Sequence, residues 1–91
     1  MRAYIYDRFL LPLTTGWYRE VLTRLPDDAV LLDVGIGTAG ALLGNAELIR
    51  TKRLTVVGVD IDADYIRRAT DAIAAAGLQD RVTAHLQSVY D

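Results

Sequence analysis

One stretch constrains the fold of this chain more than any other. Residues 31–40 read LLDVGIGTAG, so an apolar run passes directly into a segment with glycine at positions 35, 37 and 40. The run Ala29–Val34 is typical of a strand buried on both faces of a parallel sheet. Glycine at 35 and 37 favours a tight turn that a ligand can approach closely, where a Cβ would obstruct or strain the backbone. The helix expected next, from about Ala39 to Ile49, would offer backbone N–H groups and positive potential to an anionic group.

The segments that follow predict further strands and helices in alternation. Leu54–Val59 is rich in β-branched residues and is typical of a second strand. Asp62 is placed to cap a helix over Ala63–Ala76, and Gly77 lies where a left-handed C-terminal residue is favoured. Val82–Gln87 alternates like a strand with one polar face. This order predicts an α/β fold, a Rossmann-like parallel sheet of three strands with crossover helices, which is half of a doubly wound sheet.

The N-terminal part, residues 1–28, has a different pattern. We expect residues 1–25 to be helical or partly helical, interrupted at Pro12, so that N-terminal helices precede the sheet formed by residues 29–91. One face of the segment Thr15–Leu25 is apolar at helical spacing, and it consists of Tyr18, Val21, Leu22 and Leu25. We expect most of the aromatic residues of this part to pack against the sheet.

A second informative stretch, VVGVDID at residues 56–62, places Asp60 at the end of the second strand. An acid at this position can accept hydrogen bonds from both hydroxyls of a ribose bound across the first strand. Because Asp62 is expected to cap the following helix, Asp60 is left for a ligand. The glycine turn and Asp60 together predict an adenosine-binding site.

Two classes of adenosine ligand remain open from these residues. The spacing of Gly35, Gly37 and Gly40 matches the fingerprint of NAD and FAD enzymes, in which the turn cradles a pyrophosphate. Asp33 would repel that doubly negative group, whereas it would attract the ammonium and sulfonium groups of S-adenosylmethionine. If Asp33 has this role, we expect its carboxylate at the mouth of the glycine turn and not buried in the sheet.

Composition excludes several other classes of function. The net charge of −2 and the sequence pI near 5.2 do not indicate the basic surface of a nucleic-acid-binding protein. The chain has no cysteine, which fits a cytoplasmic protein, and from its apolar runs we expect neither a signal peptide nor a membrane-spanning segment. We expect no metal site. His85 lies in the middle of a predicted strand, where a structural or surface role is favoured over catalysis.

The motifs resemble those of class I S-adenosylmethionine-dependent methyltransferases. LLDVGIGTAG is similar to the first motif of that family, VVGVDID to the second, and AAAGLQDRVTAHLQSVYD to the segment that leads into the third strand, so the resemblance covers residues 29–91. The third glycine of the family pattern falls on Ala39, with Gly40 one residue later. The resemblance implies that the methionine end of the cofactor is held by Asp33 and the backbone of Gly35, Ile36 and Gly37. It also implies that Asp60 binds the ribose hydroxyls, that Ile61 packs against the adenine, and that Ser88 stands where the family often has an acid that bonds the adenine amine.

The resemblance further implies what the chain lacks. In the family, a second half of the domain covers the other face of the sheet, and a fourth strand pairs with the free edge of the first. We therefore expect a truncated methyltransferase that carries the S-adenosylmethionine-binding half, with an unidentified small-molecule acceptor and catalytic residues beyond Asp91. The bare sheet face and the free edge of the strand at 29–34 are expected to promote self-association. The alternative is a non-catalytic half-domain that associates with a partner chain.

Overall fold

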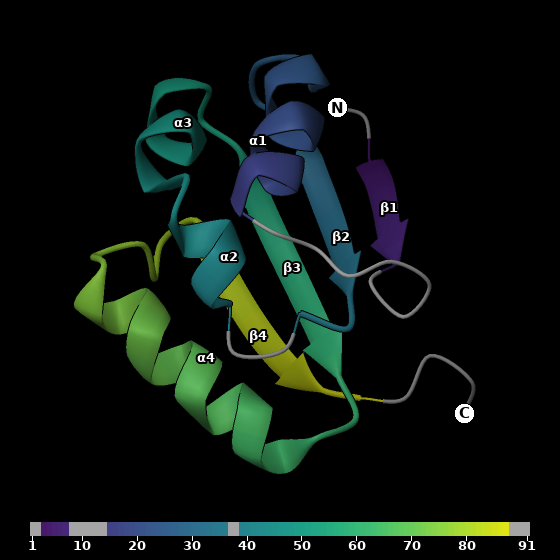
Figure 1. The fold of residues 1–91 in the computed structure, drawn as a ribbon, viewed down its shortest axis with the longest axis vertical. Coiled ribbons are helices and arrows are strands. Elements are labelled where there is room, and N and C mark those ends of the chain that lie inside the picture. The colour runs from purple at the N-terminus through teal and green to yellow at the C-terminus, as the bar shows by residue number, and fades with distance from the viewer. Residues whose placement is uncertain (1–2, 8–14, 37–38, 88–91) are drawn as a thin grey trace.

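The computed structural model describes residues 3–7, 15–36 and 39–87. Its centre is a sheet of four parallel strands in the order β1-β2-β3-β4, which is also their order in the chain (Figure 1). The strands are β1 (Ala3–Asp7), β2 (Val30–Val34), β3 (Thr55–Asp60) and β4 (Val82–Leu86). The strands β2, β3 and β4 correspond to the three strands expected from the sequence, so the predicted Rossmann-like α/β class is confirmed.

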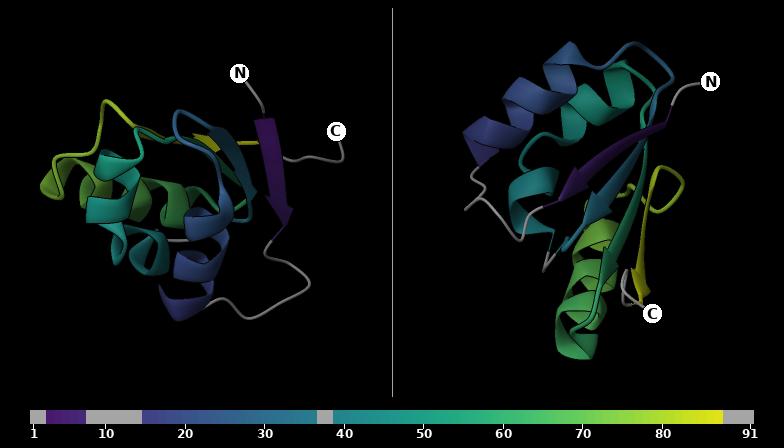
Figure 2. Two further views of the ribbon diagram at one scale, coloured as in Figure 1. Left: turned by 90° about the horizontal axis from the view of Figure 1, so that it is seen from above. Right: turned by 90° about the vertical axis from the view of Figure 1, so that its right-hand side faces the viewer.

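The helices lie together on one face of this sheet (Figure 2). They are α1 (Thr15–Arg24), α2 (Gly40–Leu43), α3 (Ala46–Thr51) and α4 (Ala63–Ala75). A right-handed crossover between neighbouring parallel strands places its helix on one side, so steps in a single direction across the sheet place every helix on the same side. The carboxyl ends of all four strands meet at one edge of the sheet, where the glycine turn also lies.

Residues 3–7 were expected to be helical, and this expectation is wrong. They form β1, which pairs in parallel with β2 from Ala3 opposite Val30 to Asp7 opposite Val34. The segment AYIYD contains aromatic and β-branched residues that suit a strand, and the open backbone groups of β2 supply its partner. The edge of β2 that was expected to be free is therefore occupied by the N-terminal strand of the same chain.

The single helix expected from Ala39 to Ile49 is also divided. α2 ends at Leu43 and α3 begins at Ala46, with Gly44 and Asn45 between them. Glycine and asparagine both have low helix propensity, because glycine loses much backbone entropy and the asparagine side chain bonds to nearby backbone. Here the Nδ2 group of Asn45 donates to the carbonyl of Ala41 at 3.5 Å.

The core lies between the sheet and the helices. Leu31 and Val56, which are in register on β2 and β3, are buried, whereas Leu32 and Val57, the next pair in register, point the other way and remain half-buried. Within the described residues no helix covers this second face (Figure 2). The part of the chain that the structure describes thus leaves this second face without a helix, as the sequence predicts, although Val34 and Val59 on it are buried and the edge of β2 is closed.

Two helix ends have the caps that their sequences predict or require. The carboxylate of Asp62 accepts hydrogen bonds from the backbone N–H groups of Asp64 and Tyr65, which confirms it as the N-cap of α4, and Gly77 has φ 69° after the helix C-terminus. The ammonium group of Lys52 donates to the carbonyls of Leu22 and Thr23 at 2.9 and 2.8 Å. A cation at this position stabilises the C-terminus of α1 and connects that helix to the turn between α3 and β3.

A bidentate ion pair joins the turn before β2 to the turn before β3. Arg53 Nε and Nη2 lie 2.8 and 2.9 Å from the two carboxylate oxygens of Asp28. The hydrogen bonds from Arg53 lower the pKa of the Asp28 carboxyl, and both side chains are solvent-exposed. The pair therefore aligns the two strands at their amino ends and adds little to the free energy of unfolding.

Candidate functional site

The glycine turn is fastened to the end of β3. Gly35 has φ 80°, a conformation that residues with a Cβ rarely adopt, and its N–H group donates to the carbonyl of Val59 at 2.7 Å. The N–H group of Ile36 donates to the same carbonyl at 3.1 Å. These two N–H groups therefore hold the turn beside Asp60, and contact between the backbone of Gly35 and Ile36 and a ligand stays a prediction. Gly37, the third predicted residue of this turn, lies outside the described residues.

Asp33 does not lie at the mouth of the turn, as the sequence led us to expect, but is fully buried. Alternation along β2 directs Asp33, like Leu31, toward the helices. There its carboxylate accepts a hydrogen bond of 2.6 Å from the hydroxyl of Tyr18 on α1. Asp33 therefore lies in the core beneath the turn. Its side chain has no open path to a ligand at the surface, so any effect on such a ligand is electrostatic and passes through the intervening polypeptide.

The side chain of Ile36 is buried in the core beside Gly58 of β3. A Cβ on Gly58 would lie 2.2 Å from Ile36 Cδ1 and 2.9 Å from Ile36 Cβ. The absence of a side chain at position 58 thus makes the space that the turn needs. Because the side chain of Ile36 is buried, only its backbone could contact a ligand.

Asp60 ends β3 next to the fastened turn. It is 7% exposed, and its Oδ1 atom accepts a hydrogen bond of 3.0 Å from the N–H group of Asp62. Its backbone carbonyl accepts a hydrogen bond from the N–H group of Gln87, which follows β4. Ile61 is 60% exposed at the same edge of the sheet, so an apolar side chain stands open beside the acid. Ser88 lies outside the described residues.

Three further observations on the described residues concern a metal site, His85 and a membrane-spanning helix. Within the ranges that the structure describes, no group of three or more His, Asp or Glu residues is arranged to hold a metal ion. His85 is exposed on β4, and its Nε2 atom lies 3.2 Å from the hydroxyl of Thr83. No helix of the described part is long and apolar enough to cross a membrane.

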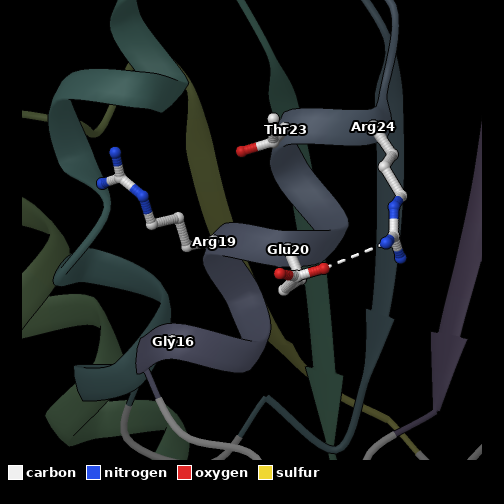
Figure 3. A pocket seen from close by; sticks show the side chains of 5 residues that line it. All are labelled: Gly16, Arg19, Glu20, Thr23 and Arg24. Atoms are coloured by element: carbon white, nitrogen blue, oxygen red, sulfur yellow. Dashed lines mark ion pairs between the residues drawn. The ribbon is translucent and has the colours of Figure 1, made fainter.

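A hollow of about 360 Å³ runs along the outer surface of α1 (Figure 3). It is lined by Gly16, Arg19, Glu20, Thr23 and Arg24. An ion pair of 3.0 Å between Glu20 and Arg24 lies across it, and both of these side chains are solvent-exposed. Neither the glycine turn nor Asp60 contributes to this hollow, so it is separate from the site that the sequence predicts.

The structure therefore brings together the glycine turn, Asp60 and Ile61 at one edge, with Asp33 below them. Two contributors were missed from the sequence. Tyr18 was assigned to core packing, although a buried tyrosine requires a partner for its hydroxyl and an acid on the next strand is an available one. No pattern in the sequence pointed to Gly58 as part of the site; its φ is not positive, and its importance comes from its contact with Ile36.

Comparison with known proteins finds similar solved structures but no matching family or curated protein by sequence. Among solved structures, the [4+2]-cyclase SpnF is similar with a TM-score of 0.72 at 24% identity, over 85% of this chain and 28% of that one. A putative sarcosine dimethylglycine methyltransferase from Galdieria sulphuraria has a TM-score of 0.65 at 25% identity, over 81% and 28% of the two chains. An S-adenosylmethionine-dependent methyltransferase from Geobacter sulfurreducens, solved with S-adenosyl-L-homocysteine, has a TM-score of 0.65 at 23% identity, over 88% and 32%.

This chain spans about a third or less of the length of each of these structures. Their functions as named include a cyclisation as well as methyl transfer, so the shared architecture does not by itself define a reaction. The order of strands and helices over most of this chain is nevertheless theirs. The chain has the Rossmann-like α/β fold of class I methyltransferases.

Proposed function

We propose that this chain binds S-adenosylmethionine and forms the cofactor-binding part of a methyltransferase that acts on a small-molecule acceptor. One observation carries the proposal: a glycine turn is fastened beside Asp60 at the carboxyl edge of the sheet, and a second acid, Asp33, is buried beneath it. An acid beneath the turn disfavours the pyrophosphate of a dinucleotide and favours a cationic ligand. The fold similarity to a methyltransferase solved with S-adenosyl-L-homocysteine supports the same assignment.

The residues at this edge fit the parts of that ligand. Asp60 would accept from the ribose hydroxyls, and the open side chain of Ile61 would cover one face of the adenine. The carbonyl of Gly35 would accept from the ammonium group, since the N–H groups of Gly35 and Ile36 are bonded to Val59 and the carbonyl of Ile36 accepts from the N–H group of Ala39. Gly37 and Ser88 remain predicted contacts. When bound, S-adenosylmethionine supplies an electrophilic methyl group, and the role of these residues is to hold and orient it.

Isothermal titration calorimetry of the whole chain tests this assignment. We expect heat of binding with S-adenosylmethionine and with S-adenosylhomocysteine, and none with NAD, because of the negative charge beneath the turn. Buffer-matched injections of adenosine serve as the control for the shared nucleoside. Heat with NAD alone would replace the proposal with a dinucleotide-binding domain.

The uncovered sheet face favours a second candidate, a half-domain that associates with another chain. The side chains of Val30, Leu32 and Val57 lie half-buried on this face, which no described helix covers. Four strands of about five residues span roughly 300 Å² at the usual strand spacing and rise. A stable interface buries about 800 Å² on each partner. We therefore expect association through this face to be weak and to depend on concentration.

Light scattering over a range of protein concentrations measures this association. The mean mass should rise with concentration for the natural chain. The double variant Leu32→Thr/Val57→Thr, which keeps residues suited to a strand, should shift that rise to higher concentration. A natural chain that stays monomeric at every concentration would count against this second candidate.

A further inference from the structure

The hydrogen bond between Tyr18 and Asp33 links α1 to the strand β2 that leads into the glycine turn. The hydroxyl of Tyr18 donates to Asp33 Oδ2 over 2.6 Å, and both side chains are completely buried. This distance is typical of an O–H donor bonded to a carboxylate, which is stronger than a bond between two neutral groups. Fifteen residues of sequence separate the partners, so the tertiary fold brings them together.

Packing alone does not require the hydroxyl. The Tyr18 ring belongs to the core with Leu22 and Leu31, where phenylalanine would fill nearly the same volume. A buried carboxyl group is costly unless hydrogen-bond donors satisfy its oxygen atoms. The hydroxyl of Tyr18 therefore satisfies and positions the carboxyl group of Asp33.

The position of Tyr18 is itself fixed. Lys52 holds the carbonyls of Leu22 and Thr23 at the C-terminus of α1, and α1 also packs on α2 and α3. The hydroxyl is thus presented to Asp33 by a helix anchored at its far end. Asp33 in turn lies two residues before Gly35, whose N–H group is bonded to Val59.

We propose that Tyr18 is a positioning residue for the ligand site, because its hydroxyl holds the carboxyl group of Asp33 in place beneath the glycine turn. Asp33 then supplies the negative potential that favours the positively charged end of the ligand. This inference rests on the proposed binding of S-adenosylmethionine. It adds a specificity determinant, outside the predicted binding motifs, that acts through another residue.

The test is a titration of the natural chain and of Tyr18→Phe with S-adenosylmethionine and S-adenosylhomocysteine. The first ligand carries an ammonium and a sulfonium group, and the second carries only the ammonium. Loss of negative potential beneath the turn must therefore weaken the first more than the second. We expect the Kd for S-adenosylmethionine to rise about three- to tenfold in Tyr18→Phe, the range for losing one hydrogen bond to a charged group with partial compensation. The ratio of the Kd for S-adenosylmethionine to the Kd for S-adenosylhomocysteine should therefore rise.

Asp33→Asn is the second variant, and it keeps the shape of the side chain while it removes the charge. It should change the ratio as Tyr18→Phe does, and Tyr18→Phe should change the ratio no further when Asp33→Asn is already present. Equal weakening of both ligands in Tyr18→Phe leaves the ratio of their Kd values unchanged, which would assign Tyr18 a purely structural role and overturn the inference. A change of this ratio that favours S-adenosylmethionine would overturn it as well. Absence of binding by the natural chain would instead reject the proposed function, so the two failures are distinguishable.

Discussion

Gly58→Ala is expected to destabilise the fold and to disturb the glycine turn together. The new Cβ would lie 2.2 Å from Ile36 Cδ1, 2.9 Å from Ile36 Cβ and 3.0 Å from Ile36 Cγ1. The Cδ1 atom can rotate away, but the Cβ atom is attached to the backbone of the turn, so the turn itself must move. Overpacking of this kind costs about 1–3 kcal/mol. Each kcal/mol lowers the Tm of a domain of this size by about 4–8 °C.

The turn is bonded to Val59 through Gly35 and Ile36, so its displacement should also weaken ligand binding. Gly44→Ala is the matched control. Gly44 is exposed and has φ −61° and ψ −13°, which alanine adopts freely, so this substitution should leave the Tm unchanged or raise it. Thermal melts and calorimetric titrations on both variants make the comparison.

A double variant decides whether the contact with Ile36 is the cause. Ile36→Gly removes every side-chain atom that the new Cβ would meet, including Ile36 Cβ, and should itself cost more than the roughly 2–5 kcal/mol typical of Ile→Ala. If Gly58→Ala acts by collision, adding it to Ile36→Gly should cost much less than it costs in the natural chain. Full additivity of the two costs would contradict the explanation.

Asp60→Ala is expected to weaken the binding of S-adenosylmethionine and S-adenosylhomocysteine about tenfold, by roughly 1.4 kcal/mol. Both ligands carry the ribose hydroxyls, and water would partly replace the lost hydrogen bonds at so open an edge. From the sequence, the Tm was expected to change little, because Asp62 caps α4. The structure changes that expectation, since Asp60 Oδ1 also accepts from the N–H group of Asp62. Loss of this bond should cost about 1 kcal/mol of folding free energy.

Two further variants separate the roles of these neighbouring acids. Asp60→Asn keeps an oxygen for the N–H group of Asp62, so it should retain the Tm and still lose affinity. Asp62→Ala removes the N-cap of α4, so it should lose about 0.5–2 kcal/mol of stability and retain affinity. Unchanged affinity in Asp60→Ala would remove Asp60 from the site. Affinity lost only in proportion to Tm would make it a structural residue.

The sequence by itself determined the part of the fold in which local signals agree. β2, β3 and β4 are continuous or alternating apolar runs, and α4 has its cap, its inner stripe of Ala69 and Ile73, and its terminal glycine in sequence. The same-side placement of the helices follows from the handedness of the crossovers, and Figure 2 shows it. The edge proposed to bind the ligand follows from where these strands end. The division of the chain at residue 28 as two parts of one domain stays a prediction, although β1 belongs to the same sheet as β2.

The tertiary structure decided what depends on partners distant in the chain. Whether AYIYD becomes helix or strand depends on the unpaired edge of β2, which no local pattern reveals. Asp33 is buried because its side chain points from β2 toward α1, where it meets the hydroxyl of Tyr18. Gly58 matters because the side chain of Ile36 packs directly against it. These contacts join residues that the sequence separates by 15, 22 and 27 positions, so they arise only when helices and strands pack together. Periodicity fixes which face a residue occupies, and packing alone fixes what that residue meets there.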